Sequence, residues 1–280
     1  MTLTVRPPTN ATIAQAVARA YGTPSLVIDL DVVDRNIAKL QALCDGAGVA
    51  NRPHIKTHKS VDLAKRQMAA GAQGITCQKL GEAEVMAAGG IDDIVISYNL
   101  LGEATMGRLA RLAERTTVAV CADNPVVVEH LGTAASQMTR PLRVLVECDT
   151  GRKRAGVVTP NEAVTLARTI EATPGLIFEG LLLYPPEDGW PQTLAFFAET
   201  RDGLADAGLS PRIVSTGGTP NLANLGQLQG ATEHRSGTFI FNDKMMLSQG
   251  AATLEELALH VVATVVSRAE EDRGILDAGS

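Results

Sequence analysis

A lysine flanked by two histidines is the first feature of this sequence that could do chemistry. The segment Arg52–Lys59 reads RPHIKTHK. We expect it at the end of a strand, where alternation would put His54, Lys56 and His58 on one face. At the mouth of an apolar barrel the lysine would be partly desolvated, which favours a free amine able to form a Schiff base. A solvated surface loop is an equal alternative, and the HxxxH spacing lacks the helical context of a zinc site.

A second candidate is a glycine-rich turn. Ser215–Pro220 reads STGGTP and directly follows the strand-like run RIVS. Two glycines flanked by threonines at a strand end expose backbone N–H groups and hydroxyls, which suit a phosphate dianion. A plain turn is the alternative, and we favour phosphate binding over it.

Two further segments end strand-like runs with polar side chains. Asp149–Gly156 reads DTGRKRAG, which resembles a Walker loop only in spacing because no GK[ST] follows. Its three basic residues could meet an anion or a phenolate oxygen, or could simply be solvated. Tyr184 ends the run GLLLY, where its hydroxyl could bond a ligand ring or lie in the core or rim.

These residues must be positioned by strands that alternate with helices. Most of the strand-like runs are continuous rather than alternating in polarity, as in parallel sheets buried on both faces. Amphipathic helical segments lie between them, with expected N-caps at Asp31, Asn124 and Thr159. The order predicts an α/β fold, and roughly eight units favour a (β/α)8 TIM-type barrel. The runs are SLVIDL, NRPHIK, GITCQ, DIVISYN, VAVCAD, LRVLVECD, IFEGLLLY, RIVSTG and EHRSGTFIF.

Nine candidate strands are one too many for such a barrel. We prefer NRPHIK as the first strand, which makes RIVSTG the seventh, where phosphate sites of these barrels occur. Counting SLVIDL first makes RIVSTG the eighth, which fits the same rule. Leu259–Val266 and Gly274–Gly279 read as strands with no helix between them. We therefore expect an N-terminal arm over 1–22, a barrel over 23–243, with strand 25–30 possibly shared, and the beginning of an incomplete β-domain over 244–280.

Composition excludes several classes of protein. The 280 residues are 45% hydrophobic and carry a net charge of −6, which argues against a nucleic-acid binder. No stretch approaches the ~20 apolar residues of a membrane span, and the N-terminus does not read as a secretory signal. The four cysteines form no CxxC or metal-like cluster, so we expect buried, reduced thiols and a cytoplasmic protein. They are Cys44, Cys77, Cys121 and Cys148.

Four motifs together resemble the D-threonine aldolase and D-serine dehydratase family. They are RPHIKTHKS, CQKLGEAE, ECDTGRKRAGV and STGGTP, in that order along the chain. The family consists of fold-type III pyridoxal-phosphate enzymes with an alanine-racemase-like barrel. The resemblance runs from about Thr23 to the last residue.

The resemblance implies a role for each matching position. Lys56 matches the Schiff-base lysine, Arg154 an arginine near the cofactor's phenolate oxygen, and Tyr184 a tyrosine near its ring. Gln78, in the CQK motif, is expected to line the pocket, with His54 as a partner behind Lys56. The common GTY pattern appears here with phenylalanine at Phe239, so any hydroxyl contact there is lost. The phosphate cradle corresponds to Thr216, Gly217, Gly218 and Thr219.

The family implies a lyase that cleaves D-β-hydroxy-α-amino acids. We favour retro-aldol cleavage to glycine and an aldehyde, as for D-threonine or 3-hydroxy-D-aspartate, over a D-serine or 3-hydroxyaspartate dehydratase. A divalent metal (Mn, Mg or Zn) is expected to assist, with ligands in a C-terminal β-domain beyond Ser280. Relatives place the β-domain of one subunit over the barrel of another, which implies a homodimer.

Two hypotheses of other classes stay open. One is a non-catalytic pyridoxal-phosphate carrier, against which the strands after Asp243 and the HIKTHK context argue. The other is a barrel enzyme acting on a phosphorylated substrate without pyridoxal phosphate. Two strands cannot form a stable β-domain alone, since about three are needed. We therefore expect the natural chain to continue past Ser280 by a domain of the ~100-residue class.

Overall fold

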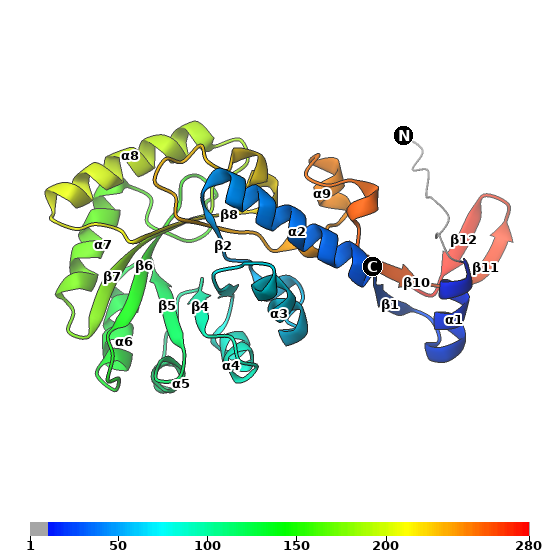
Figure 1. The fold of residues 1–280 in the computed structure, drawn as a ribbon, viewed down its shortest axis with the longest axis horizontal. Coiled ribbons are helices and arrows are strands. Elements are labelled where there is room, and N and C mark those ends of the chain that lie inside the picture. Colours follow the sequence, from blue (N-terminus) through cyan, green and yellow to red (C-terminus); the bar gives the residue numbers. More distant parts are fainter. Residues whose placement is uncertain (1–10, 280) are drawn as a thin grey trace.

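Eight short parallel strands curl into a barrel in the computed structural model, which describes residues 11–279 (Figure 1). The strand order is β2-β9-β8-β7-β6-β5-β4-β3. A parallel bridge between His54 and Thr76 joins the two ends of this order, and the Thr76 N–H donates to the Pro53 carbonyl at 2.8 Å. This confirms the predicted barrel class. The strands are β2 Ala50–Asn51, β3 Ile75–Cys77, β4 Asp93–Ile96, β5 Thr117–Ala122, β6 Leu142–Cys148, β7 Leu176–Leu183, β8 Ile213–Gly217 and β9 Glu233–Arg235.

Helices cover the outside of the barrel. Two expected caps are confirmed: the Asn124 side chain accepts from Val127 N–H, and Thr159 forms a capping box with Glu162. The helices around the barrel are α2 Leu30–Ala47, α3 Val61–Ala69, α4 Leu80–Ala88, α5 Glu103–Ala113, α6 Pro125–Ala135, α7 Pro160–Ala172 and α8 Trp190–Asp206. Short 3₁₀ segments are η1 Ile55–Thr57, η2 Thr219–Asn224, η3 Thr238–Ile240 and η4 Leu254–Glu256.

The expected cap of the first of these helices is wrong by two residues. Asp29, not Asp31, is the N-cap of α2, and its Oδ1 accepts from the N–H groups of Asp31 and Val32 at 3.0 and 3.1 Å. The strand before it ends at Ile28, so Asp29 is the residue with extended backbone and a free carboxylate at the junction. Asp31 lies in the first turn, where its charge suits the helix dipole.

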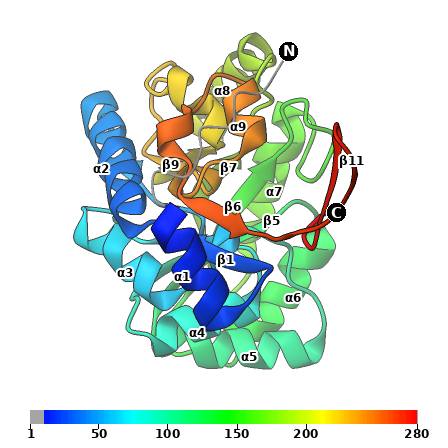
Figure 2. The ribbon, with the colours of Figure 1, turned by 90° about the vertical axis from the view of Figure 1, so that its right-hand side faces the viewer.

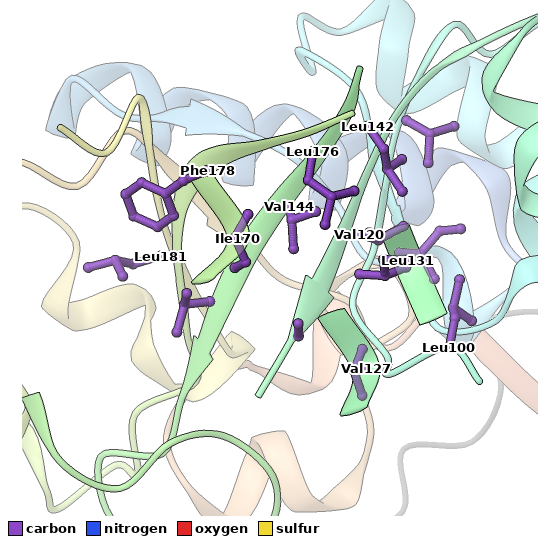
Figure 3. Packing of buried hydrophobic residues seen from close by; sticks show 14 of the residues in the cluster. Leu100, Val120, Val127, Leu131, Leu142, Val144, Ile170, Leu176, Phe178 and Leu181 are labelled. Atoms are coloured by element: carbon purple, nitrogen blue, oxygen red, sulfur yellow. The ribbon is translucent and has the colours of Figure 1, made fainter. Parts of the chain in front are cut away.

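Apolar packing fills the space between strands and helices. Outward-facing side chains of β5 and β6, including Val120 and Val144, contact buried residues of α6 and α7 such as Leu131 and Ile170 (Figure 3). Inside the barrel the apolar cluster is small. It consists of Val95, Ala119, Cys121, Leu145, Leu182 and Ile213.

Charged side chains fill much of the remaining barrel interior. Arg52 is buried and donates from Nε to Glu233 Oε2 at 2.6 Å and from Nη1 to Asp93 Oδ1 at 2.7 Å. Ser215 donates its hydroxyl to Glu233 Oε1 at 2.6 Å and accepts from Arg235 Nη1. A polar chain therefore runs from Asp93 at the start of β4 through Arg52, Glu233 and Ser215 to Arg235, and all its members except Asp93 are buried.

Two small antiparallel sheets lie at one end of the molecule (Figures 1 and 2). The strand β1, Ser25–Ile28, pairs with β10, Leu259–Val262, and so lies outside the barrel, as the preferred strand count requires. The expected strand over Leu259–Val266 is broken in two, because β11, Val265–Glu270, pairs instead with β12, Arg273–Leu276.

Helices adjoin these sheets. Residues 1–10 of the expected N-terminal arm lie outside the described residues, and Ala11–Tyr21 form α1. The helix α9, Lys244–Ser248, follows the barrel. Among the helices of the described residues, none is long and apolar enough to cross a bilayer.

Candidate active site

Lys56 lies on a 3₁₀ turn at the barrel mouth, not on a strand. The expected alternation of His54, Lys56 and His58 on one strand face is therefore wrong. Backbone hydrogen bonds to the β9 segment continue beyond β2 from Arg52 and His54, and the chain then turns into η1 at Ile55. The ring Nδ1 atoms instead accept backbone hydrogen bonds, His54 from Lys56 N–H at 3.3 Å and His58 from Ser60 N–H at 3.0 Å.

The surroundings of Lys56 favour its uncharged form. Desolvation lowers the pKa of the Lys56 amine, and repulsion from Arg154 and Arg235 lowers it further, while Glu82 acts in the opposite direction. The side chain nevertheless remains accessible from the mouth. An accessible amine with a lowered pKa is the form in which lysine attacks a carbonyl carbon.

His54 lies next to this amine as a neutral ring. Burial lowers the pKa of His54 well below its ordinary value, and the nearby positive charges of Lys56 and Arg235 act in the same direction. Its Nε2 lies 3.3 Å from Ser97 Oγ, and Ser97 Oγ donates to the Cys77 carbonyl. Since Nδ1 accepts a hydrogen bond, the proton of the neutral ring belongs on Nε2.

The glycine-rich turn after β8 approaches the same region. Gly218 has a φ of +106°, and a Cβ there would come within 2.9 Å of Tyr184 Cε2. A Cβ on Gly237, in the next loop, would meet His54 O and Thr57 Oγ1 at 3.1 Å. Thr219 connects the two loops by accepting from Phe239 N–H at 3.2 Å. The Gly237 loop therefore brings bare backbone close to the turn that bears Lys56, and the glycine-rich turn is joined to this loop through Thr219.

Thr216 is turned away from this backbone cradle. Its hydroxyl lies 2.9 Å from His234 Nδ1, and both side chains line a small space with Trp190 and Asn221 behind the sheet. The structure thus brings Gly218 and Thr219 to the mouth, whereas the Thr216 side chain supports the turn from behind.

Arg154 and Tyr184 lie together, and the Tyr184 ring lies beside Gly218. The Arg154 guanidinium carbon is 5.1 Å from the centre of the Tyr184 ring, and that of Arg152 is 3.8 Å from it. Arg152 also donates to the Tyr184 carbonyl at 3.2 Å. Cation–π contacts of this kind fix the ring plane.

Gln78 follows β3 at the barrel mouth. Its N–H donates to Glu82 Oε2 at 2.8 Å, and Glu82 also pairs with Lys59 at 3.3 Å. Glu82 thus counters the positive charges around Lys56, a role that the sequence analysis missed although CQKLGEAE contains this residue.

Arg235 and Glu147 are two further buried groups that were missed. Burial lowers the pKa of the Arg235 guanidinium to about 10, against the attraction of Glu233 and Glu147. Burial also raises the pKa of Glu147, against the effect of Arg154. The alternation in EHR, with Glu233 and Arg235 on one face, was the signal that could have revealed Arg235.

This set of groups fits a phosphorylated aldehyde such as pyridoxal phosphate. The amine can bond to the aldehyde carbon, the bare backbone and arginines can face anionic oxygens, and the tyrosine can face a ring. A cavity of about 260 Å³ between α2 and η2 is lined in part by Thr219 but by neither Lys56 nor Arg154, so we place the site at the lysine. Within residues 11–279, no group of three or more His, Cys, Asp or Glu side chains could hold a metal ion.

Known proteins resemble this chain over most of its length. The model of the alanine racemase N-terminal domain family matches residues 28–244. A D-threonine aldolase from Arthrobacter is 35% identical over 92% of this chain and 71% of its own. A 3-hydroxy-D-aspartate aldolase from Paracoccus denitrificans is 34% identical, over 92% of this chain and 72% of its own.

A dehydratase and a solved aldolase structure are similar to the same extent. A D-threo-3-hydroxyaspartate dehydratase from Delftia is 34% identical, over 92% of this chain and 71% of its own. The crystal structure of a D-threonine aldolase from Filomicrobium marinum superimposes with a TM-score of 0.86 at 32% identity, over 92% of this chain and 73% of that one. The chain therefore belongs to the alanine racemase N-terminal domain family, in the branch that holds the D-threonine aldolases and D-serine dehydratases.

Proposed function

We propose that this protein is a pyridoxal-phosphate lyase that cleaves D-β-hydroxy-α-amino acids by a retro-aldol reaction. The observation that carries the proposal is the accessible Lys56 amine, whose pKa is lowered by burial and by Arg154 and Arg235, on a turn that the bare backbone of Gly237 approaches closely. The names of the aldolase relatives support D-threonine and 3-hydroxy-D-aspartate as the substrate class.

Different residues at the mouth would bind different parts of the cofactor. Lys56 would bond to its aldehyde carbon, and Arg154 would face its phenolate oxygen. Gly217, Gly218 and Thr219 would surround its phosphate, with Thr216 behind them. Tyr184 and Gln78 would lie beside the ring. Pyridoxal phosphate, when bound, supplies a conjugated ring that accepts the electrons released when a bond at Cα breaks.

The protein's own groups would manage charge and protons around that ring. Arg154 and Arg235 provide a positive potential that favours anionic phosphate and carboxylate groups at the mouth. The lowered pKa makes the Lys56 amine easier to deprotonate than an ordinary lysine, which suits it to accept and return a proton at Nζ. His54 stays neutral and holds the backbone N–H of Lys56, so the amine keeps its place.

We further propose that a divalent metal (Mn, Mg or Zn) assists. Such an ion lowers the pKa of a bound hydroxyl and stabilises a leaving hydroxide, so it suits either an aldolase or a dehydratase. We also propose that 244–280 begin a β-domain after the barrel and that the protein is a homodimer. A cytoplasmic location is supported by four free, buried cysteines.

A dehydratase remains the second candidate, because the Delftia relative is as similar as the aldolases. The two activities are separated by incubating the full-length protein, with pyridoxal phosphate and Mn²⁺, with D-threonine and with D-serine. Glycine and acetaldehyde from D-threonine are expected. Pyruvate and ammonia from D-serine would instead favour the dehydratase.

The assay needs one control for the stereochemistry of the substrate and one for the requirement for Lys56. L-Threonine should give no product, and Lys56→Ala should remove the activity toward D-threonine. Neither product from either D-amino acid, with cofactor and metal present and the protein folded, would contradict both candidates.

A further inference from the structure

Arg154 is carried by a loop that folds back on its own strand. After β6, the Asp149 N–H donates to the Val157 carbonyl, and the Val157 N–H donates to the Glu147 carbonyl, both at 2.9 Å. Gly156 closes the loop with a φ of +118°, and a Cβ there would come within 2.5 Å of Asp149 N. Only glycine fits at this point, so the position of the loop depends on the backbone near Gly156.

A carboxylate on the neighbouring strand holds the loop at this glycine. Asp123 follows β5, and its Oδ2 accepts from Gly156 N–H at 3.1 Å. Its Oδ1 accepts from the side-chain amides of Asn99 and Asn124, both at 2.7 Å. A carboxylate is an acceptor at both oxygens, so three donors around it fix its orientation. Asn99 follows β4, so two strand ends together hold the loop of a third.

The Arg154 side chain itself has weak contacts. It is 55% exposed, and its Nη2 lies 3.5 Å from Glu147 Oε1, at the limit of a hydrogen bond. Its backbone N–H is better held, because it donates to Asp149 Oδ2 at 3.0 Å. The place of the guanidinium is therefore set by the loop backbone together with the Tyr184 ring, whose centre is 5.1 Å from the guanidinium carbon.

We propose that Asp123 is a positioning residue, which holds the loop at Gly156 and so keeps the Arg154 guanidinium facing Lys56 at the barrel mouth. The hydrogen bonds of Asp123 lie within the protein and do not depend on a bound cofactor. The proposal rests on the proposed function only for the role of Lys56.

The direction in which the pKa of Lys56 changes shows whether Asp123 acts by positioning Arg154 or only through its own negative charge. Repulsion from Arg154 and Arg235 lowers the pKa of Lys56, after desolvation, and Glu82 raises it; neutral His54 adds no charge. Loss of the Asp123 negative charge alone would lower the pKa of Lys56 or leave it unchanged. Release of Arg154 from the mouth would raise it.

The experiment measures the reactivity of Lys56 toward acetic anhydride across pH in the cofactor-free, full-length protein. Mass spectrometry of the Lys56 peptide gives its apparent pKa. Asp123→Ala and Arg154→Gln should each raise it. Asp123→Ala added to Arg154→Gln should raise it no further, because Arg154 is already gone.

Two variants separate positioning from a general structural fault. Asn99→Ala keeps every charge in place but loosens Asp123, so it should raise the apparent pKa of Lys56 by less than Asp123→Ala. Asp123→Asn keeps one acceptor oxygen but turns a donor NH2 toward either Gly156 or the two asparagine amides, so it should raise the apparent pKa of Lys56 by less than Asp123→Ala. Circular dichroism checks that each variant is folded.

The proposal is overturned if folded Asp123→Ala leaves the pKa of Lys56 unchanged or lowers it. It is equally overturned if Arg154→Gln does not raise this pKa. If Asp123→Ala does not fold, Asn99→Ala decides, and no rise in that variant contradicts the proposal. The titration needs no cofactor, so failure of Lys56 to bind pyridoxal phosphate would count against the proposed function alone.

Discussion

On its outer face the barrel sheet packs against helices through apolar side chains, whereas its inner face carries buried charges. The same strand supplies both faces, since β6 turns Val144 outward and Leu145 and Glu147 inward. The outer layer is a continuous apolar cluster over α4 to α8, and Figure 3 shows the part of it around α6 and α7. The inner apolar cluster is small, and beside it lies a polar chain in which Arg52 pairs with Glu233 and Ser215 joins Glu233 to Arg235.

This difference indicates that the outer face mainly stabilises the fold and the inner face mainly sets the charge near Lys56. Burial of apolar area on the outside stabilises the barrel without any demand on the chemistry of the mouth. The buried ions inside contribute little net stability as pairs, because their desolvation offsets their attraction. They do set the charge near Lys56, since Arg235 is one of the groups that lower its pKa.

Removal of a buried ion inside the barrel should have the largest effect on stability. Arg52→Met leaves Glu233 and Asp93 without their shared cation in a buried site. An uncompensated buried charge costs about 3–5 kcal/mol, so the free energy of unfolding should fall by that amount in urea denaturation.

An arginine on the outer surface is the matched control for Arg52. Arg108 pairs with Glu84 between α5 and α4 and is exposed to solvent. Because solvent screens this pair, Arg108→Met should leave the unfolding midpoint nearly unchanged. Equal losses from the two substitutions would show that the inner and outer ions do not differ as described.

Deletion of apolar volume in the outer layer should destabilise the fold without changing the site. Leu131 is fully buried in α6, so Leu131→Ala should lower the free energy of unfolding by about 2–5 kcal/mol. The apparent pKa of Lys56, measured by amine labelling, should stay as in the parent protein. A shift of that pKa in folded Leu131→Ala would show that packing on the outer face also affects the site.

Acid should weaken the fold through a histidine behind the sheet. Burial lowers the pKa of His234 to about 3, with repulsion from Arg235 in the same direction. Between its ordinary 6.5 and about 3, the unfolded chain binds a proton that the folded chain does not, so stability falls as pH falls. The loss is at most about 1.4 kcal/mol per pH unit.

The variant that tests this pH dependence is His234→Asn, whose side-chain oxygen can replace Nδ1 as a partner of Thr216. Urea denaturation at pH 6.5 and pH 5 should show a smaller difference in the variant than in the parent protein. His54 and His58, whose pKa values are also lowered, should keep part of the slope. An unchanged slope would exclude His234 as its source.

Much of the barrel could be predicted from local pattern, because continuous apolar runs and capped helices are properties of short segments. The preference for NRPHIK as the first strand is confirmed by the pairing of β1 with β10 outside the barrel. The N-cap of α2 was misplaced because Asp29 and Asp31 are equally good cap residues, and only the end of β1 at Ile28 decides between them.

The site was predictable in its motifs but not in its supporting contacts. Lys56 and the glycine-rich turn are recognisable by residue type and spacing. Their link through Gly237 depends on contacts between residues far apart in sequence. The roles of Glu82, Arg235 and Asp123 depend on neighbouring strand ends in the same way, so they appear only once the barrel is closed.

The most direct test of the account is the location of the cofactor on the chain. The full-length protein is incubated with pyridoxal phosphate and reduced with borohydride, and its peptides are then analysed by mass spectrometry. The account predicts one stoichiometric adduct on Lys56, accompanied by loss of absorbance in the near ultraviolet to violet, and no adduct in Lys56→Ala. An adduct on another lysine, or none at saturating cofactor, would contradict the account.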